Sequence, residues 1–169
     1  MATFSRIPTA RSLVIVPAAL TLVVTTIRFA LEKFGAPAWL ANSGPGGVGA
    51  LIGIVWLPLL FGPWFALRIR EAVATNRAVW KPLAKTLLLY GFLARLPVAL
   101  LTIPAVVYGW GTHYDGFPPA LADASVPARI GAAFLAQLVF WACVWTVVAG
   151  SLAGMLVLAL RRGQRVATA

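Results

Sequence analysis

One arginine, Arg95, lies within a long apolar segment, residues 86–108, where a charge is energetically costly. It is the tenth residue of that segment, about 13 Å from its start if the segment forms a helix. A charged side chain near the centre of a membrane costs about 2.5–3.5 kcal/mol on insertion scales, and it usually faces other helices or a wet cavity. Arg95 is therefore the first candidate for a site that binds an anion or a partner.

Arg95 has no obvious counter-ion in its own chain. The four acids are Glu32, Glu71, Asp115 and Asp123. None of them is expected at the depth of Arg95. Backbone carbonyls are a structural alternative, because Pro97 and Pro104 each remove one helical hydrogen bond and free an acceptor for the guanidinium. Three tryptophans expected deep in the apolar segments could also cover its face: Trp56, Trp141 and Trp145.

Two apolar segments carry polar stripes. The first stripe consists of Thr21, Thr25, Arg28 and Glu32, and the second of Gly91, Arg95, Val98 and Thr102. Spacings of three and four residues place each set on one helix face. Arg28 and Glu32 also have the spacing of an ion pair, and with Arg95 they form the candidate anion or partner site. The stripes either pack against each other, which we favour, or line a cavity that opens outward.

A predicted loop, residues 109–129, contains the single histidine of the chain, His113, two residues before Asp115. Histidine and aspartate at this spacing can supply two metal ligands or an acid–base pair. A metal site needs more than two ligands, so we predict no metal and no cofactor here. A turn in which Asp115 and Gly116 reverse the chain is the favoured interpretation.

The last apolar segment, residues 130–160, has a face of small side chains. They are Ala142, Thr146, Gly150 and Gly154, one at every fourth position. Small residues at this spacing let another helix approach closely. We expect that helix to come from the same chain, and a second subunit is the alternative. The opposite face holds Gln137, Trp141 and Trp145, which indicates packing more than a shelf for a cofactor.

The composition indicates which element types must position these residues. The chain has 169 residues, of which 61% are hydrophobic and only 11% charged, and a soluble domain usually has about a quarter charged residues. The net charge of +10 would suggest nucleic acid on a polar chain, but the basic residues lie in short runs between apolar segments. The single cysteine, Cys143, excludes an intrachain disulfide. The excess apolar surface must face lipid.

A helix of about 20 apolar residues crosses roughly 30 Å of hydrocarbon. Four segments qualify: residues 12–31, 48–67, 86–108 and 130–160. The sequence therefore predicts an all-α integral membrane protein, a four-transmembrane-helix bundle in one membrane domain. The last segment is about 46 Å long as a helix, so it must tilt or extend past the bilayer. We expect the first segment to be retained, because its apolar stretch exceeds the roughly 7–15 residues of a cleaved signal peptide.

Basic residues predict the orientation, because cytoplasmic loops retain positive charge. Most of the 14 Lys and Arg residues fall before the first segment, in a basic loop at residues 68–85 and in the C-terminal tail. The outer loops, residues 33–47 and 109–129, hold Lys33 and Arg129. Both termini are therefore expected inside. The excess of arginine over lysine is typical of a bacterial genome, so we expect a multi-pass protein of the bacterial inner membrane.

The scarcity of reactive side chains favours a non-enzymatic accessory or scaffold subunit of a membrane assembly. Its partners would be the lipid bilayer and another membrane subunit or a second copy, without nucleic acid. The first alternative is a small carrier or channel for an anionic or polar solute that uses Arg95. The second alternative is a membrane enzyme that acts on lipid or quinone near the outer interface with His113, Asp115 or Glu32.

Overall fold

The computed structural model describes residues 9–41, 52–73 and 75–167, and every regular element in this part of the chain is helical. Two long helices are α1 (Ala10–Lys33) and α4 (Asn76–Tyr108). A third, continuous along its length, consists of α5 (Val126–Phe134), a π-helix η2 (Leu135–Trp145) and α6 (Thr146–Ala167). Three shorter elements complete the described chain: α2 (Ala38–Ala41), α3 (Leu57–Arg70) and the 3-10 turn η1 (Pro119–Leu121).

Three helices are long and apolar enough to cross a membrane among the residues described: Ala10–Lys33, Asn76–Tyr108 and Val126–Arg161. They have 24, 33 and 36 residues. Even the first is about 36 Å long, which exceeds the roughly 30 Å of hydrocarbon. Their lipid-facing surfaces are apolar, with large exposed side chains such as Ile15, Leu100 and Leu152. The all-helical fold of a membrane protein is confirmed at this level.

The second expected span differs from the structure. Residues 48–51 lie outside the described residues, and residues 52–56 form bends and turns instead of the helix predicted there. The helix α3 begins at Leu57 with Pro58 in its first turn and has only 14 residues, about 21 Å. Proline fits the first helical turn because it lacks the N–H that a later position would need. Pro58 therefore marks the start of a helix here.

The basic loop predicted at residues 68–85 is also much shorter than expected. The helix α3 continues to Arg70, and α4 begins at Asn76 instead of residue 86. The side chain of Thr75 accepts a hydrogen bond from the backbone N–H of Ala78 and so caps α4. Arg70 Nε donates to Asn76 Oδ1 at 2.7 Å across the turn. Lys81 and Lys85, assigned to the loop, consequently lie on a helix.

The C-terminal helix extends beyond the predicted residues 130–160 in both directions and contains the π-helix η2, which the sequence did not indicate. In a π-helix each backbone bond joins residues five apart, so the turn is wider than in an α-helix. Thr146 Oγ1 donates to Trp141 O, five residues earlier, at 2.7 Å. Because the turn is wider, the side chains of α6 point in other directions than they would if the whole helix were α-helical.

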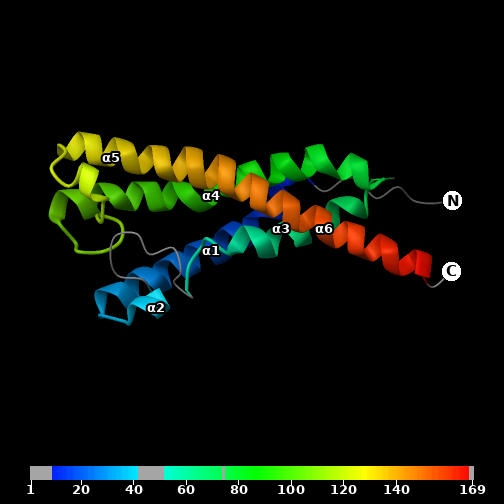
Figure 1. Cartoon of the computed structure of the whole chain (residues 1–169), viewed down its shortest axis with the longest axis horizontal. Helices are drawn as coiled ribbons and strands as arrows, with labels where there is room; N and C mark the ends of the chain where they lie inside the picture. The colour runs from blue at the N-terminus through cyan, green and yellow to red at the C-terminus, as the bar shows by residue number, and fades with distance from the viewer. Residues whose placement is uncertain (1–8, 42–51, 74, 168–169) are drawn as a thin grey trace.

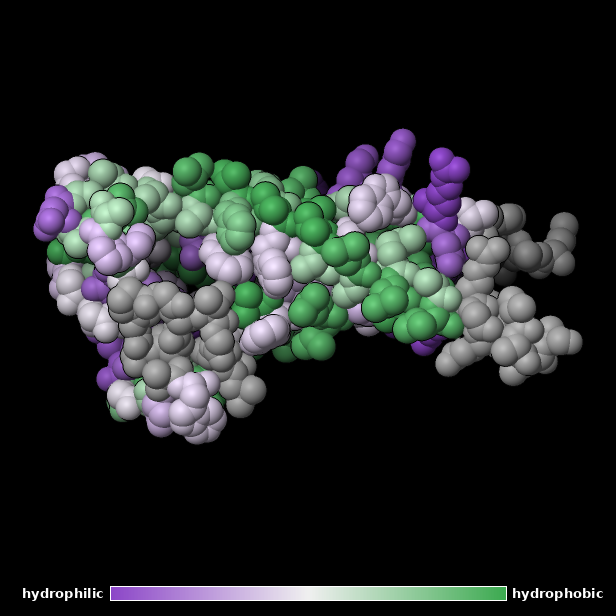
Figure 2. Space-filling model, viewed as in Figure 1, coloured by the Kyte–Doolittle hydropathy of each residue, from purple (hydrophilic) through white to green (hydrophobic). Residues whose placement is uncertain are grey.

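The helices run along one axis, as Figure 1 shows, and the two ends of the bundle differ in charge. At one end α1 begins, α3 meets α4 and α6 ends; Arg68, Arg70 and Arg77 lie there, and we call it the basic end. At the other end lie α2 and the chain between α4 and α5, and we call it the loop end. Figure 2 shows apolar side chains along the bundle and hydrophilic ones gathered toward its ends.

The small face of the C-terminal helix packs inside the chain, against α3 and α4. Gly150 and Gly154 of α6 face Gly62 of α3, and a Cβ at Gly154 would lie 2.8 Å from the Gly62 carbonyl oxygen. Ala142 of η2 faces Gly91 of α4, where a Cβ would lie 2.6 Å from the Ala142 carbonyl oxygen. Both distances are too short for real contacts. The described packing thus follows the intrachain alternative, with backbone against backbone.

Candidate anion-binding cavity

A cavity of about 120 Å³ lies between α1, α4, η2, the irregular chain before α3 and the loop after α4. Its lining residues are Thr25, Arg28, Gly53, Ile54, Val55, Arg95, Val98, His113, Tyr114, Gln137 and Trp141. At about 30 Å³ per water molecule in the liquid, this is room for a few waters or a small ligand. The lining mixes apolar side chains with several polar groups, as is usual for small-molecule sites.

Arg95 is the buried charge at this cavity. Only 6% of the residue is exposed. Its Nη1 donates to Gln137 Oε1 at a long 3.4 Å, and its guanidinium carbon lies 5.0 Å from the ring centre of Trp141. Its Nη2 has no hydrogen-bond partner among the described residues. Nη2 is itself buried, and a buried guanidinium N–H group without an acceptor is costly, so a partner that reaches it would stabilise the side chain.

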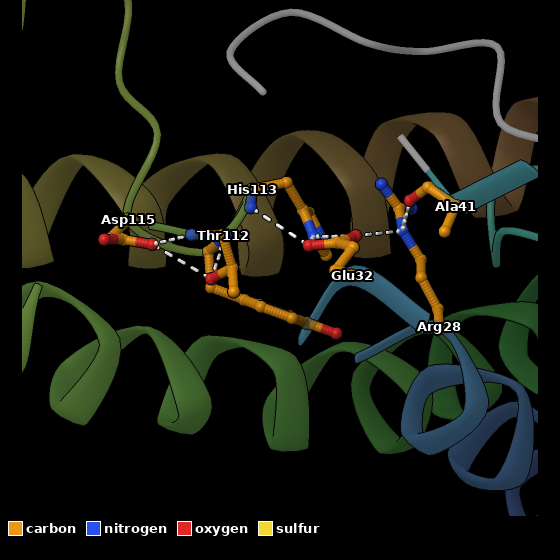
Figure 3. Close-up of polar contacts among 7 residues, drawn as sticks. Arg28, Glu32, Ala41, Thr112, His113 and Asp115 are labelled. Atoms are coloured by element: carbon orange, nitrogen blue, oxygen red, sulfur yellow. Dashed lines mark hydrogen bonds and ion pairs between the residues drawn. The ribbon is translucent and has the colours of Figure 1, made fainter. Parts of the chain in front are cut away.

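A second cluster of charged and polar side chains surrounds Glu32, the one acidic residue of α1 (Figure 3). Arg28 Nε donates to Glu32 Oε1 at 3.0 Å, and His113 Nδ1 lies 2.6 Å from the same oxygen. The backbone N–H of His113 donates to Glu32 Oε2 at 3.1 Å. We call Arg28, Glu32 and His113 the Glu32 clasp. It fastens the loop after α4 onto the end of α1, with the Glu32 side chain only 1% exposed.

The protonation of His113 follows from its contacts. A carboxylate only accepts hydrogen bonds, so the Nδ1 that faces Glu32 carries a proton. Burial lowers the pKa of His113 below its usual value, against the opposing effect of Glu32. Near neutral pH the ring is therefore uncharged and the Glu32 carboxylate neutralises Arg28. Among the described residues at the cavity, Arg95 then supplies the one uncompensated charge.

Asp115, considered together with His113 from the sequence, has a structural role in the loop after α4. Its carboxylate accepts hydrogen bonds from the backbone N–H groups of Gly111 and Thr112 at 2.8 and 2.7 Å, and from Thr112 Oγ1 at 2.9 Å. Burial acts to raise the pKa of Asp115, but these hydrogen bonds hold it below its usual value. His113 is bonded to Glu32, not to Asp115. In the described part of the chain no three His, Cys, Asp or Glu residues are grouped for a metal ion.

The first polar stripe contacts α4 near the middle of the bundle, where Thr21 Oγ1 lies 2.8 Å from the hydroxyl of Tyr90, a residue outside the second stripe, in a buried hydrogen bond between helices. Nearer the loop end, Thr25 and Arg28 line the cavity together with Val98 and Arg95 of the second stripe. The cavity is thus lined by residues of both stripes.

Several cavity residues were missed as site residues. Gln137 was assigned to a packing ladder, although it is the only amide in its apolar segment and so was a usable signal, whereas the contact of Trp141 with Arg95 was among those expected. The wall formed by Gly53, Ile54 and Val55 had no such signal, because a helix was expected there. Trp145 Nε1 donates to the carbonyl of Val55 at 2.9 Å and holds this irregular chain in place.

Fold and cavity together define a helical membrane protein, with at least three helices able to cross the bilayer and a buried arginine beside a small cavity. No protein-family model matches the chain, and no curated protein or solved structure is significantly similar to it.

Proposed function

We propose that this protein binds a small anionic solute in the cavity beside Arg95 and carries it across the membrane. The observation that supports the proposal best is the position of Arg95: its buried, positively charged side chain lines a cavity, and its Nη2 has no hydrogen-bond partner among the described residues. Intramembrane ionisable residues are functional-site candidates because their burial must be offset by a specific partner. An anion bound in the cavity would neutralise this charge, and Nη2 would donate to it once the side chain turns toward the cavity.

The surroundings of Arg95 suit a binding site better than a purely structural role. Gln137 holds one nitrogen and the ring of Trp141 covers the guanidinium, so the side chain is already oriented before any ligand arrives. Preorganised donors lose little entropy on binding. The backbone-carbonyl alternative would leave no free nitrogen, whereas Nη2 has no acceptor among the described residues.

The irregular chain before α3 supports a carrier more than a rigid scaffold. Non-helical backbone at membrane depth is tolerated where it lines a cavity, and transporters use such interrupted helices to build sites. Gly53, Ile54 and Val55 form this wall, and α3 begins only two residues later.

We also propose a four-crossing topology with both termini inside the cell. The course of the described chain supports it: the Ile52 N–H donates to the Leu40 carbonyl of α2 at the loop end, at 3.0 Å, and α3 ends at the basic end, so residues 52–70 run from one end of the bundle to the other. The second crossing would then be part helix and part irregular chain. The positive residues of the basic end favour its placement in the cytoplasm.

Binding can be tested on the purified full chain in mild detergent. We expect sodium acetate to raise the thermal unfolding midpoint. A control solution of acetamide, the uncharged analogue, with sodium chloride at the same ionic strength should not raise it. Arg95→Gln should lose this stabilisation, because hydrogen bonds to charged groups contribute about 1.5–3 kcal/mol. The matched control is Arg68→Gln, since Arg68 is exposed at the basic end and pairs with Glu71 at 3.5 Å.

Transport is tested on the same variants in liposomes. Acetate uptake by the wild type and by Arg68→Gln, with loss in Arg95→Gln, is the expected result. If Arg95→Gln folds and responds to acetate as the wild type does, the anion site is excluded. The accessory-subunit and enzyme interpretations stay predictions; a stoichiometric partner retained in mild detergent, without any anion effect, would favour the former.

A further inference from the structure

We propose that the cavity selects monocarboxylates with a small apolar body over dicarboxylates and other divalent anions, because the Glu32 clasp cancels the charge of Arg28. This inference rests on the proposed function and names its class of substrate. It follows from the charges, the hydrogen-bond donors and the apolar walls of the cavity.

The charges leave room for one negative charge. Arg28 and Arg95 both line the cavity, so their side chains alone would suit a dianion. Glu32 Oε1, however, lies 3.0 Å from Arg28 Nε, and the Glu32 side chain is almost fully buried. His113 completes the clasp as an uncharged donor. The sum at the cavity is therefore a single positive charge, and a dianion would leave one negative charge buried without a partner.

The donors point to the same conclusion. Of the two terminal nitrogens of Arg95, Nη1 already donates to Gln137 and Nη2 is free. The ring of Trp141 lies 5.0 Å from the guanidinium carbon and occupies one side of it. Nη2 is buried, so one carboxylate oxygen satisfies this donor once the guanidinium turns toward the cavity. A second carboxylate on the same ligand would meet no unpaired cation among the described lining residues.

The remaining walls favour an apolar body on the ligand. Ile54 and Val98 are buried and line the cavity together with the ring of Trp141. Apolar walls of this kind stabilise a short hydrocarbon chain and do not replace the hydration shell of a second charge. A small fatty-acid anion thus suits the cavity better than sulfate, phosphate or a dicarboxylate.

Butyrate and succinate are the probes, because they share a four-carbon skeleton and differ by one carboxylate. Their dissociation constants are measured by calorimetry on the full chain in mild detergent near neutral pH, with butyramide as the uncharged analogue. We expect butyrate to bind at least about tenfold more tightly than butyramide, since loss of one charge-assisted hydrogen bond is worth about tenfold or more. We expect a similar factor over succinate, because its second carboxylate would be buried without a partner.

The clasp is tested by Glu32→Gln, which keeps the shape of the side chain and removes its charge. The cavity would then hold two positive charges, so the preference should move toward succinate by about tenfold. The double variant Arg28→Gln with Glu32→Gln restores a single charge and should restore the preference for butyrate. Glu71→Gln is the matched control, because it removes an exposed acid at the basic end.

Each outcome decides one claim. If no anion binds the wild type, the proposed function fails. If butyrate and succinate bind the wild type equally, the proposed function stands and the charge selection is wrong. If chloride binds as tightly as butyrate, the requirement for a carboxylate with an apolar body is wrong. Should Glu32→Gln fail to fold, the comparison of butyrate and succinate on the wild type still decides the charge selection.

Discussion

At His113 the carboxylate of Glu32 meets a ring nitrogen and a backbone N–H group of the same residue. This double contact fixes the loop after α4 in one position relative to α1. A second set of contacts supports it, because Lys33 Nζ donates to the carbonyl of Trp110 at 2.8 Å and the ring of Phe29 lies 5.3 Å from that of Trp110. The Glu32 clasp is thus one of two sets of contacts that attach this loop to α1.

The titration of His113 predicts a loss of stability in mild acid. Burial lowers its pKa in the folded chain below the value of about 6.5 expected in the unfolded chain. Between these two pKa values the unfolded chain binds more protons than the folded chain. Acidification through this window therefore lowers the free energy of unfolding, and no further loss from His113 follows below the folded pKa.

Thermal unfolding midpoints of the wild type and of His113→Gln, recorded across that pH window, check this expectation. Glutamine keeps a donor for Glu32 but does not titrate, so its profile should be flatter. A wild-type midpoint that rises on acidification would contradict the lowered pKa of His113. The pKa of Asp115 is held below its usual value of about 4, so Asp115 does not titrate near the upper end of this window, where the loss from His113 begins.

At the scale of helices, the contact between Gly91 of α4 and Ala142 of η2 sets how closely the two elements approach. A methyl group at Gly91 would lie 2.6 Å from the Ala142 carbonyl oxygen. The Gly91→Ala variant should therefore lose about 1–3 kcal/mol of stability through overpacking, and the displaced η2 should weaken anion binding through Gln137.

Gly131→Ala is the control for this variant. Gly131 lies in α5 and is exposed, and a methyl group added there would meet no described atom within 4 Å. Alanine there should be neutral or stabilise by up to about 1 kcal/mol, because glycine weakens a helix interior. Equal midpoints for the two alanine variants in thermal unfolding would show that the close approach at Gly91 is not limiting.

Sequence patterns predicted the long helices well because membrane crossing imposes a length and an apolar composition on each. They also predicted which residues of α1 share a face with Glu32. They failed at Gly53 to Trp56, where an apolar chain is irregular because Pro58 starts the helix α3. The π-helix was equally unpredictable, since its side chains have the same apolar character as those of an α-helix.

The sequence predicted most residues of the candidate site but not the contacts between them. We identified Arg95 from the apolar segment around it, and Arg28 and Glu32 from their spacing along one helix face. The contact of His113 with Glu32 joins residues 81 positions apart and depends on how the loop after α4 folds. The pairing of His113 with Asp115, the alternative to a turn, is not formed: His113 binds Glu32, and Asp115 accepts hydrogen bonds from backbone N–H groups of the loop.

At the scale of the whole molecule, the proposed topology predicts which ends are accessible from which side. Single cysteines would replace Lys81 near the basic end and Ala122 at the loop end, both exposed, in a Cys143→Ala background. In intact cells an impermeant thiol reagent should label Ala122→Cys, and it should label Lys81→Cys only after the membrane is opened. The reverse pattern would invert the orientation, and labelling of both in intact cells would contradict the crossing by α4.

The shortness of α3 has a consequence for how the protein is made. A helix of 14 residues spans about 21 Å and is too short to remain in the bilayer by its own hydrophobicity. Its place depends on α4, joined to it by the Arg70 to Asn76 turn, and on α6, whose glycines face Gly62. During synthesis α3 therefore becomes a stable part of the membrane only after α6, which is made later than α3, has arrived to cover it.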